Sequence, residues 1–189
     1  EQFKHALIST AKVISDDYKI DSKKNDKEFT SKNNKIIDIA NLSNKNDFIK
    51  LRAETDSDAV KKKFSNSSIF NKNLPKNKSC KSLYEMAEKT RYEILGGKML
   101  QGIKKNLNEN YYIKMNSTHK ESIKSKNDVP ITEAFELYML KKFYKLELSS
   151  LSSKILGYWE KDFNSSIGKH EDFLSQNFEN QEKYCSKFS

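Results

Sequence analysis

The chain has 189 residues, which is enough for one domain or two small ones and for a substantial buried core. Hydrophobic residues make up 35 % of it, the mean hydropathy is −0.86, and no apolar run approaches the length of about 18 residues that a membrane span needs. The apolar residues nevertheless recur at helical spacing, which predicts a folded protein with polar connectors and excludes a chain that is disordered throughout.

The net charge of +9 would fit a protein that binds nucleic acid. Only Arg52 and Arg91 are arginines, however, and bidentate recognition of phosphate or guanine favours arginine over lysine. The basic residues are also spread, with 17 basic against 11 acidic residues in 1–80 and 18 against 15 in 81–189. This pattern argues against sequence-directed binding of nucleic acid. A basic helical module that binds nucleic acid or other proteins stays as the alternative function.

The first part of the chain, residues 1–64, predicts a small α+β unit. A helix over 1–16 places Phe3, Leu7 and Ile14 on one face. Alternating residues from Tyr18 and again over 35–40 predict two short strands that pair as a hairpin. Because a two-stranded hairpin is marginal alone, we expect the first helix to cover it. A second helix is predicted over 46–64.

Residues 65–78 are rich in Asn and Ser and contain Pro75, so we expect a linker here. A helix follows over 79–95, with Ser79 as its N-cap and Gly96-Gly97 as the corner that ends it. A second helix starts at Met99. Gly102 lies inside this helix, where it costs about 1 kcal/mol relative to Ala, which favours a close helix–helix contact.

The remaining residues predict three more helices, over 132–146, 149–163 and 167–188. Their connections are short, which favours antiparallel neighbours. The predicted fold is therefore mainly α: a bundle of about five helices in 79–189, preceded by the small α+β part with its two-stranded hairpin.

A search for chemistry finds no catalytic, cofactor-binding or metal site. The three histidines, His5, His119 and His170, share no spacing with one another or with a cysteine, and HExxH, CxxC and GxxxxGK[ST] patterns are all missing. We interpret His170 and the two acidic residues after it as a helix start. Cys80 and Cys185 lie far apart, and without a signal peptide they predict free thiols in the cytoplasm.

One ordered series of polar and small residues is less ordinary: Arg91, Glu93, Gly96, Gly102 and Asn106. From the residues alone, the series is a packed helical corner with a solvated Arg–Glu pair. It also resembles the N-terminal region of the CobT family. The likeness continues in Asp128-Val-Pro-Ile-Thr-Glu-Ala134, Trp159-Glu160 and Ile167-Gly168, and it is best over residues 79–189.

The resemblance implies a function that the residues alone do not. CobT proteins are subunits of the aerobic, ATP-dependent cobaltochelatase, which inserts Co²⁺ into hydrogenobyrinic acid a,c-diamide. They work with an AAA+ ATPase subunit and a large subunit that holds the corrin, and the complex uses ATP, Mg²⁺ and Co²⁺. The chain lacks the family's acidic linker and its von Willebrand A-type domain, so we expect a fragment.

The implied role of this part is docking and assembly, without catalysis and without a cofactor of its own. The resemblance makes Arg91 and Glu93 candidates for contact with the AAA+ subunit. The basic surface is a candidate for binding the acidic linker of the full-length protein.

Overall fold

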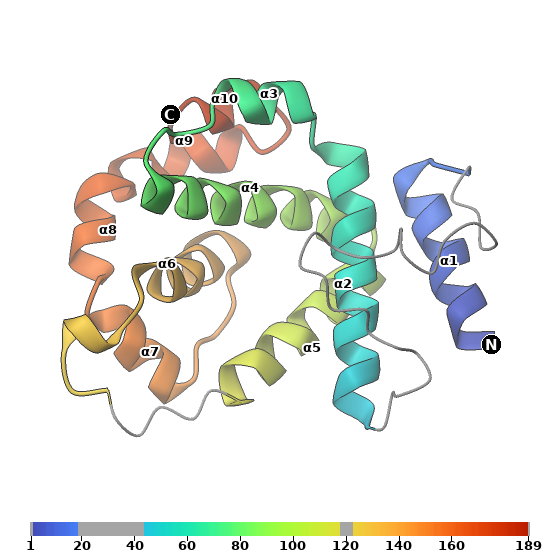
Figure 1. The fold of residues 1–189 in the computed structure, drawn as a ribbon, viewed down its shortest axis with the longest axis horizontal. Helices are drawn as coiled ribbons and strands as arrows, with labels where there is room; N and C mark the ends of the chain where they lie inside the picture. Colours follow the sequence, from blue (N-terminus) through green and yellow to red (C-terminus); the bar gives the residue numbers. More distant parts are fainter. Residues whose placement is uncertain (1, 19–43, 118–122, 189) are drawn as a thin grey trace.

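The computed structural model describes residues 2–18, 44–117 and 123–188. Every regular element in these ranges is helical (Figure 1). The helices are α1 (Gln2–Ser15), α2 (Lys45–Phe64), α3 (Ser67–Lys72), α4 (Lys78–Met99), α5 (Gln101–Ser117), α6 (Ile131–Met139), α7 (Ser150–Gly157), α8 (Glu160–Ser166), α9 (Glu171–Gln176) and α10 (Gln181–Cys185), with short turns η2 (Lys126–Asp128), η3 (Leu140–Tyr144) and η4 (Gly168–His170).

The predicted α+β part with a two-stranded hairpin is wrong as a fold class, because the described residues contain helices and no strand. Apart from Tyr18, both predicted strands lie in 19–43, outside the described residues. Helix α2 covers the apolar face of α1, burying Leu7, Ala11 and Ile14. The mainly helical character, and the first two helices, follow from the apolar spacing as predicted.

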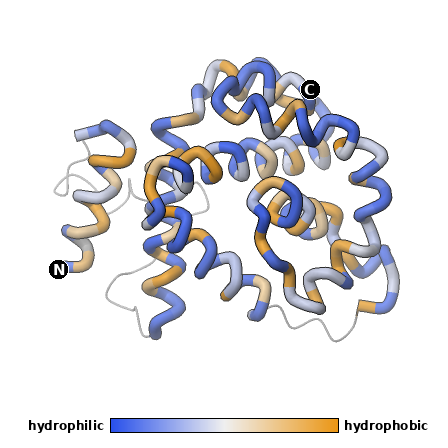
Figure 2. The backbone as a smooth tube through the Cα atoms, turned by 180° about the vertical axis from the view of Figure 1, so that it is seen from behind, coloured by the Kyte–Doolittle hydropathy of each residue, from blue (hydrophilic) through white to orange (hydrophobic). Residues whose placement is uncertain are grey.

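The helix α4 is the centre of the fold. It packs against α2, α5, α6 and η3, while α3, α9 and α10 lie along its other side (Figure 1). Tyr84 and Ala87 on this helix are fully buried. Hydrophobic and hydrophilic residues alternate along the helices, as expected for helices that bury one face (Figure 2).

A single buried core joins the segments on both sides of the predicted linker. Its members run from Ala11 in α1 to Cys185 in α10. The predicted linker itself contains α3, and its Phe70 and Leu74 pack against this core. The ring of Phe70 stacks on Tyr84 with centroids 4.8 Å apart. Whether 1–64 and 79–189 fold as separate units stays a prediction.

The corner between α4 and α5 lies four residues later than predicted. Helix α4 runs through Gly96 and Gly97 in right-handed geometry and ends at Met99, and the extended backbone of its C-cap, Leu100 (φ −138°, ψ 120°), makes the turn. Its N-cap is Asn77, whose side chain accepts hydrogen bonds from the next turn, and not Ser79. Gly96 therefore serves packing: a Cβ placed there would lie 2.4 Å from Cγ1 of Val60 in α2.

The C-terminal third is more broken than predicted. Helix α6 passes into the π-helical turn η3, which ends at Lys145 in the left-handed conformation (φ 57°). The helix predicted over 149–163 is α7 and part of α8, and that predicted over 167–188 is η4, α9 and α10. Aromatic contacts hold the pieces, such as Phe135 of α6 against Phe163 of α8 at 5.3 Å. Within the described ranges, no helix is long and apolar enough to span a membrane.

Two of the helical glycines, Gly96 and Gly102, provide a matched test of the packing. Gly96→Ala should lower the free energy of unfolding by about 1–3 kcal/mol, because the new methyl group overlaps the stiff, fully buried Val60. Gly102→Ala should raise it by up to about 1 kcal/mol, since nothing lies within 4 Å and alanine favours the helix. Urea unfolding of both variants measures the difference. Equal effects would contradict the close approach of α2 to α4, and Val60→Ala should rescue Gly96→Ala.

Candidate functional site: two buried polar clusters on the central helix

The first cluster is an ion pair inside the fold. The Arg91 guanidinium donates from Nε to Glu88 Oε2 (2.7 Å) and from Nη2 to Glu88 Oε1 (2.8 Å), which is a bidentate arrangement. Arg91 is 1 % exposed and Glu88 2 %. The two residues are three positions apart on α4, so they lie on the same helix face.

The remaining bonds of this pair connect α4 to two distant segments. Arg91 donates to the carbonyl oxygen of Phe178, before α10, at 2.7 Å, and to that of Phe64, at the end of α2, at 2.5 Å. Glu88 accepts from the hydroxyl of Ser65 (2.8 Å) and from Nε2 of Gln181 (2.9 Å). One buried ion pair thus fixes the α2–α3 junction and the C-terminal helices to α4.

The second cluster surrounds Glu93, which is also 1 % exposed. Its carboxylate accepts hydrogen bonds from Ser57 of α2 (2.6 Å) and from the hydroxyl of Tyr111 of α5. The ammonium of Lys89 lies 3.7 Å from Glu93 Oε1. Burial, with the charge of Glu93, raises the pKa of Tyr111 well above its ordinary value, so the phenol stays a hydrogen-bond donor. Glu93 therefore links α2, α4 and α5.

Asn106 of α5 completes the contact with α2. Its Nδ2 donates to Asp56 Oδ2 at 2.6 Å, and both side chains are buried. Burial raises the pKa of Asp56, while the bond from Asn106 lowers it. The net effect is a raised pKa, so the folded state holds the Asp56 proton more tightly than the unfolded state does. Protonated Asp56 therefore adds to the free energy of unfolding at low pH, and this contribution is lost as the pH rises through the raised pKa.

The structure brings four of the five predicted site residues together inside the fold. Arg91, Glu93, Gly96 and Asn106 are buried, and each contacts another helix or the C-terminal segment. Gly102 is exposed, so the expected close helix contact at this glycine is wrong. The prediction of a solvated pair between Arg91 and Glu93 is also wrong, because Arg91 is buried and pairs with Glu88.

Sequence reasoning missed the residues that complete the two clusters. Glu88 was identifiable, because a carboxylate three positions before Arg91 shares its helix face. Gln181, Ser57 and Tyr111 lie far from these partners along the chain, and no local pattern indicates such contacts. A direct contact of Arg91 or Glu93 with another subunit stays a prediction.

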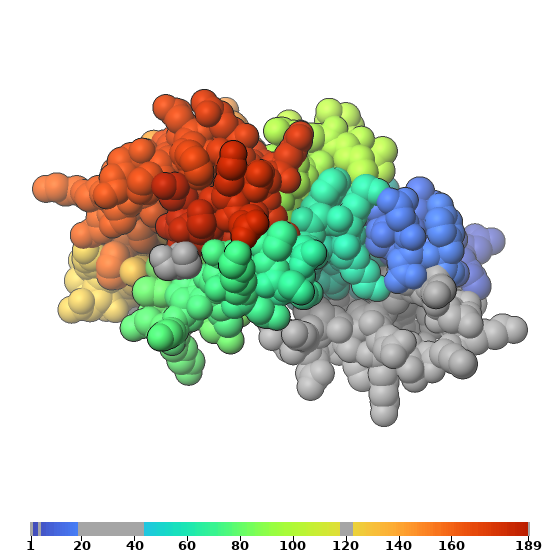
Figure 3. All heavy atoms as spheres, turned by 90° about the horizontal axis from the view of Figure 1, so that it is seen from above, coloured from blue at the N-terminus to red at the C-terminus, as the bar shows by residue number. Residues whose placement is uncertain are grey.

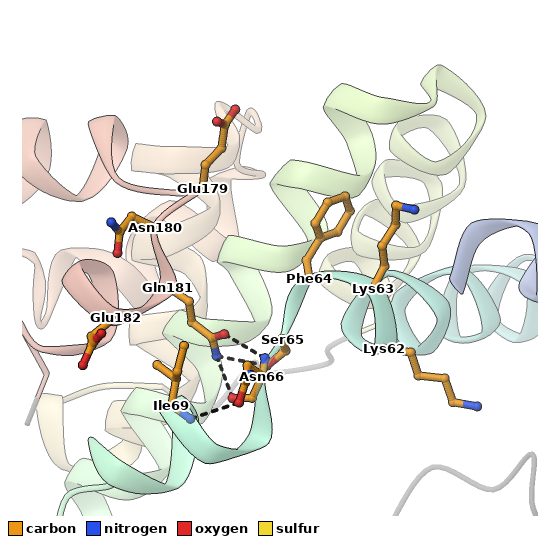
Figure 4. A pocket seen from close by; sticks show the side chains of 10 residues that line it. All are labelled: Lys62, Lys63, Phe64, Ser65, Asn66, Ile69, Glu179, Asn180, Gln181 and Glu182. Atoms are coloured by element: carbon orange, nitrogen blue, oxygen red, sulfur yellow. Dashed lines mark hydrogen bonds between the residues drawn. The ribbon is translucent and has the colours of Figure 1, made fainter. Parts of the chain in front are cut away.

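A groove of about 670 Å³ lies beside the first cluster (Figure 4). Its floor is held by Gln181, whose Oε1 accepts from the Asn66 backbone at 2.7 Å and whose Nε2 donates to the Asn66 carbonyl at 3.2 Å. Lys62 and Lys63 lie on one side of the groove and Glu179 on the other, with their charged ends directed away from the bonded floor (Figure 4). The groove is open to solvent, and both polar and apolar side chains line it.

A small cavity of about 30 Å³ lies between α5, α6 and α7. It is lined by Tyr111, Glu136 and Ser152 among others. The Oε2 atom of Glu136 accepts from Lys114, whereas its buried Oε1 atom has no hydrogen-bond partner. The volume is close to that of one water molecule, the usual partner of such a buried oxygen.

Metal-binding side chains do not gather in the part of the chain that the structure describes. Within 2–18, 44–117 and 123–188, His, Cys, Asp and Glu form no group of three or more that could hold an ion. His170 ends η4 immediately before α9, as the sequence predicts for a helix start, and His119 lies outside the described residues. Cys80 is exposed and Cys185 buried, and both thiols are free.

Comparison with known protein families gives a match over nearly the whole chain. The model of one protein family, described as cobalamin biosynthesis protein CobT, matches residues 1–188. The match extends the predicted resemblance over residues 1–78. No solved structure matches the chain.

The buried ion pair should dominate stability. Arg91→Met should lower the free energy of unfolding by about 3–5 kcal/mol, because it leaves Glu88 charged and unpaired in the core. The control Lys141→Ala removes an ion pair of similar length (2.6 Å) that is exposed, and should cost at most about 1 kcal/mol. Chemical denaturation measures both. Equal costs would contradict the structural role of Arg91, and adding Glu88→Met should recover part of the loss.

The two thiols should differ in reactivity. Burial, with the nearby charge of Glu88, raises the pKa of Cys185 to about 12, so at pH 8 it is a thiol shielded from reagents. Alkylation of the native protein should modify Cys80 alone, and Cys185 should react only after unfolding. Mass spectrometry of the digested protein identifies the modified residue, with Cys80→Ser as the control. Labelling of both residues at the same rate in the native state would show that α10 is not held against α4.

Proposed function

The chain belongs to the CobT family of cobalamin biosynthesis proteins, and we propose that it is the non-catalytic assembly domain of a cobaltochelatase subunit. In this proposal it docks the AAA+ ATPase subunit of the complex. The large chelatase subunit holds the corrin, and the ATP, Mg²⁺ and Co²⁺ that the reaction uses are bound outside this domain. The family match across residues 1–188 is the observation that carries the proposal.

The use of the family-like residues inside the fold supports a scaffolding role. Arg91 and Glu93 connect α4 to α2, α5 and the C-terminal segment, and none of their bonds is directed to solvent. Side chains used in this way determine the relative positions of helices. We infer that they affect partner binding indirectly, by holding the docking surface in shape.

The cytoplasm is the setting that we propose for this assembly. Cys80 and Cys185 are both free, and free thiols are typical of a reducing compartment. ATP, which drives the partner subunit in this proposal, is available there.

Reconstitution tests the proposal. The purified chain alone should neither hydrolyse ATP nor insert Co²⁺, whereas mixing it with the AAA+ subunit should give a complex that elutes earlier in size-exclusion chromatography. Gly102→Ala, at an exposed position, should assemble like the unmodified chain. Arg91→Met should assemble less well in proportion to its unfolded fraction.

Two outcomes would contradict the proposal. ATP hydrolysis by the isolated chain would assign it a catalytic role. A well-folded chain that forms no complex with the AAA+ subunit would remove the docking role.

A further inference from the structure

Although the basic residues are spread along the chain, the excess of basic over acidic residues is concentrated in one stretch. Between Asp58 and Glu85 there are seven lysines and no acidic residue. This stretch contributes +7 of the net charge of +9. Its lysines are the run 61–63 together with Lys72, Lys76, Lys78 and Lys81, and all of them lie within the described residues.

The fold keeps these lysines along one side of the molecule, which we term the lysine edge. The run 61–63 is the last turn of α2, Lys72 ends α3, and Lys76 precedes α4, whose first turns carry Lys78 and Lys81. These consecutive segments form a continuous band in the view from above (Figure 3). Six of the seven lysines are exposed, and Lys63 is half-buried.

Only part of this charge is neutralised by the residues that the structure describes. Lys62 lies 3.9 Å from Asp17, Lys63 pairs with Asp16, and Lys72 is 2.5 Å from Glu182. Lys61, Lys76, Lys78 and Lys81 form no ion pair with the described residues. A cluster of like charges that the described residues leave unneutralised is a surface that attracts acidic partners.

We propose that the lysine edge is a docking surface for an extended acidic polypeptide segment of a partner protein. The groove beside Lys62 and Lys63 gives such a segment a place to lie, with Phe64 and Ile69 as apolar contacts between the charged positions. This inference rests on the proposed assembly function, because it names the chemistry through which this chain would recognise a partner.

The residue types favour a polypeptide over a nucleic acid. All the basic residues of the edge are lysines, which act as point charges and lack the planar fork that arginine offers to phosphate. The exposed aromatic side chains within the described residues, such as Tyr18, Phe48 and Tyr112, lie outside the stretch 59–84, so the edge offers no exposed ring on which a base could stack.

A binding experiment with synthetic probes tests the inference on the full chain. The probe is a fluorescent peptide of about 12 residues in which Glu alternates with Ser, long enough when extended to span about 40 Å. A peptide with Gln in place of Glu and a single-stranded DNA of equal charge serve as comparisons. Fluorescence anisotropy at about 0.15 M salt should show binding of the acidic peptide, no binding of the Gln peptide and weaker binding of the DNA. The affinity should fall steeply as salt is added, because the contacts are exposed.

Charge-reversal variants distinguish binding at the lysine edge from a general effect of the net charge of the chain. Lys76→Glu, Lys78→Glu and Lys81→Glu together should weaken peptide binding by about tenfold or more, since three attractive contacts become repulsive. The control reverses three lysines elsewhere that are also exposed, Lys105→Glu, Lys161→Glu and Lys169→Glu, and changes the net charge by the same amount. The control should bind within about twofold of the unmodified chain. Circular dichroism confirms that both variants are folded.

Three results would overturn the inference: equal loss in both triple variants, equal binding of the Gln peptide, or tighter binding of the DNA than of the acidic peptide. These results are distinguishable from failure of the proposed function. A chain that joins the AAA+ subunit and ignores the acidic peptide overturns this inference alone. A chain that binds the peptide through the edge and forms no complex with that subunit overturns the proposed function.

Discussion

The buried pair of Arg91 and Glu88 is the interaction on which the other contacts of the fold depend. Removing two charges from water is costly, and the cost is offset only where the remaining donors and acceptors are satisfied. Here Arg91 donates its remaining hydrogen bonds to the backbone carbonyls of Phe64 and Phe178, and Glu88 accepts one from the side chain of Gln181. The three segments that contribute these groups must therefore meet at one place on α4. Helices as short as α3, α9 and α10, of five or six residues, would not be stable alone.

The polar interior also explains how a chain with 35 % hydrophobic residues builds a core. Helix α2 contacts α4 and α5 through Ser57 with Glu93 and through Asp56 with Asn106, as well as through Ala53 and Val60. Polar contacts of this kind require specific geometry, so each fixes the rotation of one helix relative to the next. The approach of Val60 to Gly96 brings the backbones of α2 and α4 close enough for the hydrogen bonds to form.

Features that depend on neighbouring residues could be predicted from the sequence. Features that depend on contacts between residues far apart along the chain could not. Helices α1 and α2 follow from apolar spacing. The corner at Leu100 was predicted four residues too early, because a Gly pair usually ends a helix and here tertiary packing at Gly96 overrides that preference. The role of Gln181 could not be predicted, since its partner Glu88 lies 93 positions away. The α+β fold class was wrong because the described residues hold helices and no strand, and short apolar runs in a sequence are ambiguous between strand and other structure.

The positions of the family-like residues distinguish two roles that the sequence alone could not tell apart, which are holding the fold together and contacting a partner. A series such as Arg91, Glu93 and Asn106 is restrained by what each side chain bonds inside the fold, and any replacement disturbs two helices at once. Residues that meet a partner must lie on the surface, where the fold restrains them little. Six of the seven lysines in 61–81 meet that requirement, and the property they share is charge. Recognition through charge tolerates changes in the individual positions so long as the edge stays basic. The internal series therefore holds the helices together, and in the docking proposal the exposed lysines are the positions that contact the partner.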